Sequence, residues 1–306
     1  MRYLGIDVGG TKVALRLEGA GEQGEPEEAV FRWPAPGDTA RDLAALAAGI
    51  AGLRERRPGP VTAVGVAMPA TLDGTGRVVT WPNRPSWEGL ALRAELCALL
   101  PDVPAPGIRT ADDGDLAALA EAEAAGVRNL VYLGVGTGVG GGLVLDGRLC
   151  PGPERGSCEV GHLVVDRAGR RCDCGRRGCV QSVASGPAIL RRAAELRGGD
   201  VPFAELGPAL EAGEEWALEA VRESASALAS AVIGLSELTH PELAVIGGGF
   251  AAAIPGFVPA VARQVERLER PGGPRVPVAE ARLGGLSSLY GAVLLARGIR
   301  SGGADR

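Results

Sequence analysis

Residues 3–17 read Tyr3-Leu-Gly-Ile-Asp-Val-Gly-Gly-Thr-Lys-Val-Ala-Leu-Arg-Leu17, which is an apolar strand, a glycine turn and a second strand. Residues 130–145 repeat this layout as Leu130-Val-Tyr-Leu-Gly-Val-Gly-Thr-Gly-Val-Gly-Gly-Gly-Leu-Val-Leu145. We interpret the repetition as a weak internal duplication. A third apolar strand runs into Gly247-Gly-Gly249, and alanine-rich helical stretches stand between the strands. Strands and helices in this arrangement, with glycine turns at strand ends, predict an α/β fold built from two similar halves.

The composition is that of a globular protein. Of the 306 residues, 46% are hydrophobic and 23% are charged, which excludes a collagen, a disordered chain and a small disulfide scaffold. At roughly 100–200 residues per domain, this length predicts two domains. The net charge of −5 disfavours a surface for nucleic acid or anionic membranes. Because Asp7 interrupts the first apolar stretch and no apolar run is long enough to span a bilayer, we expect a cytoplasmic protein without a signal peptide.

The glycine turns are suited to binding phosphate. A turn without side chains exposes consecutive backbone N–H groups, which can cradle phosphate oxygens. In the first turn, Asp7 could hold Mg²⁺ through water, Thr11 could donate its hydroxyl to a terminal phosphate, and Lys12 adds positive charge. The alternative is an ordinary type I′ hairpin turn. Three such turns at strand ends favour a nucleotide, although they match neither the G-x-x-x-x-G-K-[ST] loop nor the dinucleotide G-x-G-x-x-G fingerprint.

Three acids cluster in Asp112-Asp-Gly-Asp115, at the start of an alanine-rich helix. Acids are favoured there as helix caps, because the N-terminal end of a helix carries partial positive charge. One of the three acids would serve as the cap. Another could be a general base, kept ionised by the helix end and aimed at a substrate hydroxyl. The sequence leaves both interpretations open.

One histidine and three cysteines have the spacing of a metal site. Nine residues separate His162 from Cys172, and Cys174 and Cys179 follow. One histidine and three cysteines make a complete tetrahedral zinc set, which is closed to water and therefore structural. The alternative is a disulfide, which a cytoplasmic location disfavours. We predict a structural zinc ion.

Together these motifs resemble the ROK family of sugar kinases and sugar-responsive repressors. The resemblance covers nearly the whole chain. It rests on Asp7-Val-Gly-Gly-Thr-Lys12, Gly136-Thr-Gly-Val-Gly-Gly-Gly142, Glu159-Val-Gly-His162, Cys172-Asp-Cys-Gly-Arg-Arg-Gly-Cys179 and Val245-Ile-Gly-Gly-Gly249.

The resemblance implies an actin/hexokinase-like ATPase fold with two lobes around a cleft. It also implies ATP and Mg²⁺, a structural zinc ion and a homodimer. It would place the small lobe at residues 1–112, joined by a C-terminal helix at about residues 291–306. The large lobe would span residues 113–290 and carry the zinc loop at residues 159–181.

The resemblance assigns roles to individual residues. Asp113 would be the catalytic base that takes the proton from the 6-hydroxyl of a sugar. Glu159 and His162 would bind ring hydroxyls, with one nitrogen of His162 on zinc and the other on the sugar. ATP and magnesium would be bound by Asp7, Gly9, Gly10, Thr11, Lys12, Gly136, Thr137, Gly138, Gly247, Gly248 and Gly249. The zinc ligands would be His162, Cys172, Cys174 and Cys179.

Two further substrate-binding positions depart from the family's pattern. The family has asparagine where this chain has Asp112, and glutamate where it has Gln181. A second carboxylate beside the base adds negative charge to one end of the pocket, and a cationic amine at C3 of the sugar would offset it. We therefore predict ATP-dependent phosphorylation of the 6-hydroxyl of an amino sugar, specifically kanosamine (3-amino-3-deoxyglucose). The alternatives are a glucokinase or another hexose or aminocyclitol kinase.

Two functions of another class fit less well. A repressor of the family would carry a DNA-binding helix-turn-helix before the first glycine turn, and Asp7 leaves no room for one. A sugar sensor without catalytic activity is disfavoured, because the chain retains Asp113 and the glycine turns. The expected partners are a sugar and ATP, with no nucleic acid and no membrane.

Overall fold

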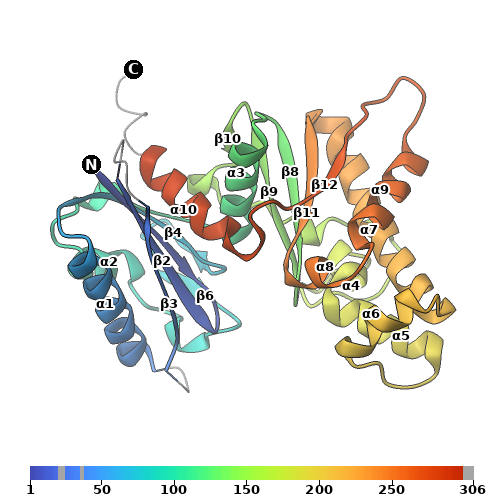
Figure 1. The fold of residues 1–306 in the computed structure, drawn as a ribbon, viewed down its shortest axis with the longest axis horizontal. Coiled ribbons are helices and arrows are strands. Elements are labelled where there is room, and N and C mark those ends of the chain that lie inside the picture. The colour runs from blue at the N-terminus through green and yellow to red at the C-terminus, as the bar shows by residue number, and fades with distance from the viewer. Residues whose placement is uncertain (20–24, 35–37, 299–306) are drawn as a thin grey trace. The chain divides into compact units, whose positions relative to one another are not determined.

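The computed structural model describes residues 1–19, 25–34 and 38–298, and these form two compact units (Figure 1). The first unit contains Met1–Ala120, Pro151–Ser157 and the C-terminal helix from Leu286 onward. The second unit contains Glu121–Cys150 and Cys158–Gly285. Each unit is built around a five-stranded sheet.

The sheet of the first unit has the strand order β3-β2-β1-β4-β7. Its strands are β1 (Arg2–Val8), β2 (Lys12–Gly19), β3 (Glu27–Arg32), β4 (Val61–Ala67) and β7 (Ile108–Ala111). Strands β1, β2 and β3 are antiparallel neighbours, whereas β4 and β7 run parallel to β1. One face is covered by α1 (Thr39–Arg56) and α2 (Leu92–Leu99), and the opposite face by α10 (Ser287–Gly298) (Figure 1). Because helices cover both faces, β1 and β4 are nearly continuous apolar runs.

The sheet of the second unit has the order β10-β9-β8-β11-β12. Its strands are β8 (Leu130–Val135), β9 (Val139–Leu145), β10 (Arg148–Cys150), β11 (Leu243–Gly247) and β12 (Val278–Glu280). The long helices α7 (Glu215–Thr239) and α9 (Phe257–Leu268) lie side by side against this sheet (Figure 1). The remaining helices are α4 (Val180–Ala184), α5 (Gly186–Arg197), α6 (Phe203–Glu211) and α8 (Gly249–Ala253).

The two sheets share one topology. In each sheet, three consecutive strands are antiparallel neighbours: β1, β2 and β3 in the first, and β8, β9 and β10 in the second. Two later strands then extend the sheet in parallel, beyond β1 in the first sheet and beyond β8 in the second. The hairpins β1–β2 and β8–β9 carry the glycine turns near residues 9 and 138. The internal duplication predicted from these turns is therefore confirmed at the level of the fold.

Helix α10 approaches its neighbours at distances that require glycine. A Cβ atom at Gly65, in β4, would lie 1.9 Å from the carbonyl oxygen of Ala292. A Cβ atom at Gly291 would lie 1.9 Å from the carbonyl oxygen of Leu116, in α3 (Asp113–Ala125). Both distances are far below van der Waals contact, so the backbones touch directly.

This packing sets the extent of the first unit. Because the start of α3 packs against α10, the first unit continues past the predicted lobe boundary at residue 112 as far as Ala120. Helix α10 itself spans Ser287–Gly298, and residues 299–306 of the predicted C-terminal helix lie outside the described residues. The predicted cleft between two lobes stays a prediction.

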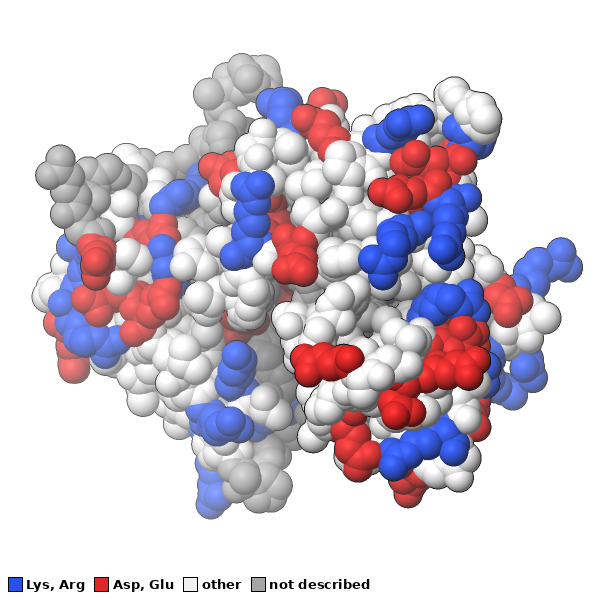
Figure 2. All heavy atoms as spheres, turned by 45° about the vertical axis from the view of Figure 1, so that its right-hand side comes forward, with Lys and Arg blue, Asp and Glu red and all other residues white. Residues whose placement is uncertain are grey.

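Arginines on the surface are paired with acids. Figure 2 shows basic and acidic side chains beside one another over the visible face. The N···O distance is 2.7 Å in the pairs Arg54–Asp102, Arg192–Glu223 and Arg270–Glu237. Such partly exposed pairs contribute about 0–1 kcal/mol each, so the apolar cores of the two units dominate stability. Within the described ranges, no helix has the length and apolar character needed to cross a bilayer.

Replacing Gly65 by alanine should destabilise the first unit by about 1–3 kcal/mol, because the new methyl group would force α10 away from β4. Gly52→Ala is a matched control, since its Cβ atom would meet nothing closer than 3.9 Å and alanine favours the helix α1 by up to about 1 kcal/mol. Urea unfolding followed by tryptophan fluorescence measures both. A Gly65→Ala variant as stable as the wild type would contradict the close packing.

Candidate functional site

The first glycine turn joins β1 to β2. The N–H of Gly9 donates to the carbonyl oxygen of Lys12 at 3.0 Å. A type I′ turn needs positive φ at both central residues. The residues between Gly9 and Lys12 are Gly10 and Thr11, and neither has positive φ, so the type I′ turn that the sequence left open does not form here. Gly10 is instead required by space, because a Cβ atom would lie 2.9 Å from Cβ of Asn83. The side chains of Thr11 and Lys12 are exposed.

Asp7 lies at the end of β1, beside this turn, in a poorly solvated place. Desolvation raises the pKa of Asp7 to about 6. A hydrogen bond from Oγ of Ser288 to Oδ2, at 2.8 Å, lowers the pKa, as does the charge of Lys12, whereas the charge of Asp113 raises it. Asp7 is therefore an anion with one neutral donor and an acid nearby, a situation that a bound cation would relieve.

Asp112 and Asp113 stand where β7 ends and α3 begins. The Oδ1 atom of Asp112 accepts the N–H of Gly114 at 2.9 Å, so Asp112 is the helix cap. Asp113 is the first residue of α3, where the helix dipole stabilises negative charge. Asp112 also lines a cavity of about 590 Å³ within the first unit. The capping interpretation thus holds for Asp112, and Asp113 lies close enough to Asp7 to influence its pKa.

The second glycine turn joins β8 to β9 in the second unit. The N–H of Gly136 donates to the carbonyl oxygen of Gly138 at 2.9 Å. Next to it, Oε1 of Gln181 accepts the N–H of Val139 at 3.1 Å, and a Cβ atom at Gly138 would lie 2.8 Å from this same oxygen. Gln181 therefore braces the turn with its carbonyl oxygen and keeps only its amide N–H groups for another partner.

Glu159 and His162 flank the short helix η4 (Val160–His162), which packs on β9. Between them, a Cβ atom at Gly161 would lie 1.8 Å from the carbonyl oxygen of Val139. Only glycine permits this approach. The contact holds the Glu-Val-Gly-His segment against Val139, the residue that follows the second turn.

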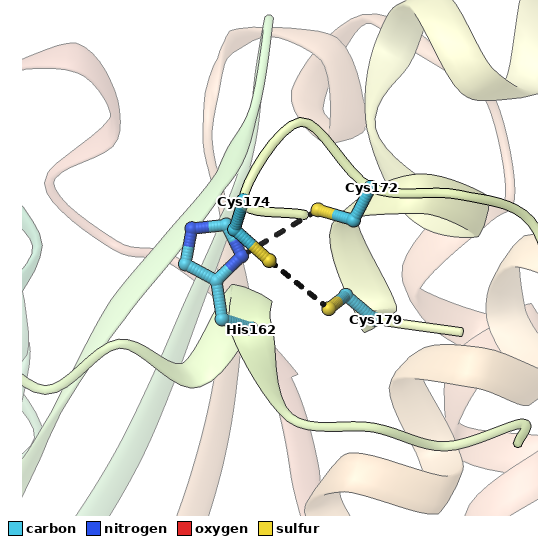
Figure 3. Close-up of side chains that lie close together, drawn as sticks. All are labelled: His162, Cys172, Cys174 and Cys179. Atoms are coloured by element: carbon cyan, nitrogen blue, oxygen red, sulfur yellow. Dashed lines mark hydrogen bonds between the residues drawn. The ribbon is translucent and has the colours of Figure 1, made fainter. Parts of the chain in front are cut away.

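Four candidate ligands converge behind η4 (Figure 3). Nδ1 of His162 lies 3.6 Å from Sγ of Cys172, and Sγ of Cys174 lies 3.6 Å from Sγ of Cys179. The four ligand atoms all lie within 4.8 Å of one another. In a tetrahedral zinc site, ligand atoms are separated by about 3.6–3.8 Å, so the set fits a metal ion. The other ring nitrogen of His162 lies on the opposite edge of the ring (Figure 3).

The thiols of this cluster differ in acidity. A backbone N–H from Arg176 lowers the pKa of Cys174 to about 7, whereas desolvation raises the pKa of Cys179 to about 12. The loop that holds them is a tight hairpin, in which a Cβ atom at Gly178 would lie 1.5 Å from the carbonyl oxygen of Asp166. A bound metal cation would remove this difference between Cys174 and Cys179, because both thiols are deprotonated when they coordinate a metal.

The third glycine turn follows β11. Gly248 has φ +89°, and a Cβ atom there would lie 2.4 Å from the carbonyl oxygen of Val135. Gly247 lies against the ring of Tyr132, where a Cβ atom would come 2.6 Å from Oη. Gly249 begins α8. This turn and the turn at residues 136–138 are thus neighbours in the second unit.

The sequence analysis missed several side chains of the first unit that contact Asp7 or the first glycine turn. Ser288 reaches Asp7 from α10, 281 positions along the chain. Trp33 and Arg84 donate hydrogen bonds to the first glycine turn from distant segments. The one signal was composition, since Trp81-Pro-Asn-Arg-Pro-Ser-Trp87 is dense in residues that form rigid packed loops.

Asp7→Asn should stabilise the first unit at about pH 8 when Mg²⁺ is absent. Because the folded state holds this proton more tightly than the unfolded chain, Asp7 costs stability as the pH rises from about 4 through about 6. A shift of about two pKa units corresponds to about 1–3 kcal/mol. Urea unfolding at about pH 4 and about pH 8 compares the variant with the wild type.

Asp73→Asn serves as a control of opposite sign. The Thr75 hydroxyl lowers the pKa of Asp73, so this acid adds stability as the pH rises, and its replacement should reduce stability at about pH 8. An Asp7→Asn effect that is the same at both pH values would contradict the desolvation of Asp7.

Comparisons with known proteins agree with this geometry. A family model described as the ROK family matches residues 3–299. Kanosamine kinase of Amycolatopsis mediterranei is 54% identical over 300 residues, covering 98% of this chain and 97% of that protein. The ROK hexokinase of Thermus thermophilus has a TM-score of 0.88 at 31% identity, covering 99% of this chain and 100% of that one.

A second solved structure is a ROK family glucokinase from Streptomyces griseus in complex with glucose and AMPPNP. Its TM-score is 0.76 at 25% identity, with 97% of this chain and 99% of that one covered. The family match spans nearly the whole chain and agrees with the motifs, the duplicated sheets and the cysteine cluster. The chain therefore belongs to the ROK family, as its motifs predict.

Proposed function

We propose that this protein is an ATP-dependent sugar kinase that phosphorylates the 6-hydroxyl of kanosamine. The observation that carries the proposal is the 54% identity to a kanosamine kinase over 98% of the chain. It supports the substrate that the residues at positions 112 and 181 predict independently. A glucokinase is the alternative, and the same experiment decides between the two.

The chemistry needs a base, an oriented hydroxyl and neutralisation of phosphate charge. In this proposal the carboxylate of Asp113 accepts the proton of the 6-hydroxyl as the sugar oxygen bonds to the γ-phosphorus and the bond to ADP breaks. Asp113 lies in the first turn of α3, where the helix dipole favours a negative charge. Asp7 would hold Mg²⁺, which when bound neutralises phosphate charge, and its desolvated carboxylate fits a cation.

The nucleotide would be bound by the glycine turns. Residues 9–12 offer backbone N–H groups, the Thr11 hydroxyl and the Lys12 ammonium group to phosphate oxygens. In the second unit, the turns at residues 136–138 and 247–249 are neighbours, and the space beside Gly136 and Gly249 is open, with no atom within 4 Å of an added Cβ. We assign both to ATP.

Asp112 would select the amine. Its Oδ1 atom caps α3, and Asp112 also lines the cavity of the first unit, so the proposal places the amine of the sugar at this carboxylate. A protonated amine at C3 would form a charge-assisted hydrogen bond with it, worth roughly 1.5–3 kcal/mol. Asparagine at this position would keep the capping oxygen and present N–H donors instead, which repel an ammonium group.

The second unit would supply the other sugar contacts. Glu159 and Nε2 of His162 would bind ring hydroxyls, while Nδ1 of His162 would ligate zinc together with Cys172, Cys174 and Cys179. The metal would then fix the orientation of the imidazole that faces the sugar. Gln181 would contribute its amide N–H groups, because its oxygen is bonded to Val139. The homodimer and the cytoplasmic location stay predictions.

The substrate is tested by measuring kcat/KM for kanosamine and glucose side by side with saturating Mg·ATP. Wild type should prefer kanosamine at least about tenfold, some 1.4 kcal/mol of transition-state discrimination. Asp112→Asn should reduce this preference by about tenfold or more without a change in thermal stability, because asparagine caps a helix as well as aspartate does.

Asp113→Asn is the control for turnover, since it should abolish transfer to both sugars while sugar binding persists. A wild-type preference for glucose would replace the proposal by a glucokinase. An Asp112→Asn variant with the wild-type preference would remove Asp112 from amine recognition.

The metal proposal is tested by elemental analysis of the purified protein, which should contain about one zinc per chain. Cys174→Ser should lose the metal and melt at a lower temperature, because only three of the four ligands remain and the Cys174–Cys179 contact is lost. Cys97→Ser changes a cysteine outside the cluster and should retain the metal. A fully loaded Cys174→Ser protein would exclude this ligand set.

A further inference from the structure

The backbone of the first glycine turn is held by two side chains that no motif includes. The carbonyl oxygen of Gly9 accepts the indole N–H of Trp33 at 2.7 Å. The carbonyl oxygen of Gly10 accepts Nη1 of Arg84 at 3.1 Å. The carbonyl oxygen of Thr11 accepts the backbone N–H of Trp33 at 3.2 Å. Three consecutive carbonyls of the turn are thus bonded to the interior of the first unit.

Arg84 is itself rigidly fixed. Its guanidinium donates Nε and Nη2 to the two carboxylate oxygens of Asp42, at 2.7 and 2.6 Å. Asp42 is fully buried, Arg84 is 8% exposed, and the indole N–H of Trp87 completes the carboxylate at 2.9 Å. The guanidinium also lies 4.8 Å from the ring centroid of Trp33. A bidentate, buried pair of this kind leaves the guanidinium little freedom. The direction of Nη1 toward the carbonyl oxygen of Gly10 is therefore fixed by the fold.

The aromatic side chains form one cluster around this pair. The rings of Trp33 and Trp87 meet edge to face with centroids 5.6 Å apart, and those of Trp81 and Trp87 at 5.0 Å. Edge-to-face contacts are the favoured geometry for aromatic pairs. The Trp33 indole is therefore held in the orientation that delivers its N–H to Gly9.

The directions of these carbonyl groups determine the directions of the N–H groups in the same peptides. In a trans peptide, the C=O of one residue and the N–H of the next point in opposite directions. With the carbonyls of Gly9 and Gly10 directed inward, the N–H groups of Gly10 and Thr11 are directed away from Trp33 and Arg84. No backbone carbonyl of the described residues accepts either N–H. Two adjacent donors are thus held ready for an anion.

We propose that Trp33 and Arg84 are positioning residues for phosphoryl transfer, an inference that rests on the proposed function. They prevent the glycine peptides from rotating, which would present carbonyl oxygens to the phosphate and repel it. Glycine peptides rotate easily because no Cβ restricts them. A glycine turn is flexible by itself, whereas a phosphate-binding turn needs N–H groups of fixed direction. The hydrogen bonds from Trp33 and Arg84 fix that direction.

The test compares two identical substitutions within the aromatic cluster. Trp33→Phe removes the donor to the Gly9 carbonyl, whereas Trp87→Phe removes an indole N–H that donates to Asp42 and touches no carbonyl of the turn. Trp33→Phe should lower kcat about tenfold, some 1.4 kcal/mol, with KM for the sugar unchanged. Trp87→Phe should keep kcat within about twofold of wild type. Equal losses of kcat in both variants would show a general packing effect and overturn the inference.

Arg84→Lys provides a second route should Trp33→Phe fail to fold. Lysine keeps the positive charge opposite Asp42 but lacks the fork that reaches Asp42 and Gly10 together. Its kcat should also fall about tenfold at an unchanged KM for the sugar. The inference would be overturned if Arg84→Lys, and Trp33→Phe where it folds, both retain the kcat of the wild type.

Affinity for Mg·AMPPNP, measured by calorimetry, separates this inference from the proposed function. Should the wild type bind the nucleotide but phosphorylate neither sugar, the proposed function fails, and the inference stands only if Trp33→Phe binds more weakly than Trp87→Phe. A wild type that does not bind the nucleotide would overturn both.

Discussion

Direct contact between backbones, possible where glycine has no Cβ, is the constraint on which the candidate groups depend. At Gly291 it brings α10 against the start of α3, so that Ser288 and Asp113 both act on Asp7. At Gly161 it brings η4 against β9, so that Glu159 and His162 lie beside a glycine turn. In each case the nearest backbone atom would be within 2 Å of an added Cβ atom. Larger residues would separate the elements, and with them the functional side chains.

Two carboxylates of the first unit, Asp42 and Asp7, differ in how well their charge is compensated. Asp42 is fully buried and accepts two bonds from Arg84 and one from Trp87, so its charge is fully compensated. Asp7 has a hydroxyl donor and another acid nearby, and its pKa is raised to about 6. A protein built for stability alone would pair or remove such a group. The proposed function gives Asp7 such a partner, because a bound Mg²⁺ would compensate its charge.

Local chemistry was readable from the sequence, and long-range support was not. The glycine turns, the helix cap among the acids and the four metal-ligand candidates are properties of short segments. The structure shows the cap at Asp112 and brings the four ligand candidates together. The family follows from the same segments. Trp33 and Arg84 reach the first turn over 24 and 74 positions, and no periodicity predicts such pairs.

The first turn shows the same limit. The sequence left a type I′ turn open as an alternative, but Gly10 has no positive φ and is glycine because Asn83 occupies the space of its Cβ atom. Similarly, Gln181 is predicted to bind the sugar, and its carbonyl oxygen also accepts the N–H of Val139, a contact that the sequence does not reveal. In both cases a distant segment adds a contact that local spacing cannot predict. Sequence reasoning thus identifies which residues matter more reliably than it identifies what they contact.

Position 112 shows how recognition can change at little cost to the fold. The cap needs one side-chain oxygen on the N–H of Gly114, and aspartate and asparagine supply it equally well. The second side-chain atom differs between the two residues: asparagine offers an N–H donor, which suits a hydroxyl oxygen, and aspartate offers a carboxylate oxygen, which suits an ammonium group. Under the proposed function, a change of one atom type at position 112 would therefore alter sugar selectivity while the capping bond is kept.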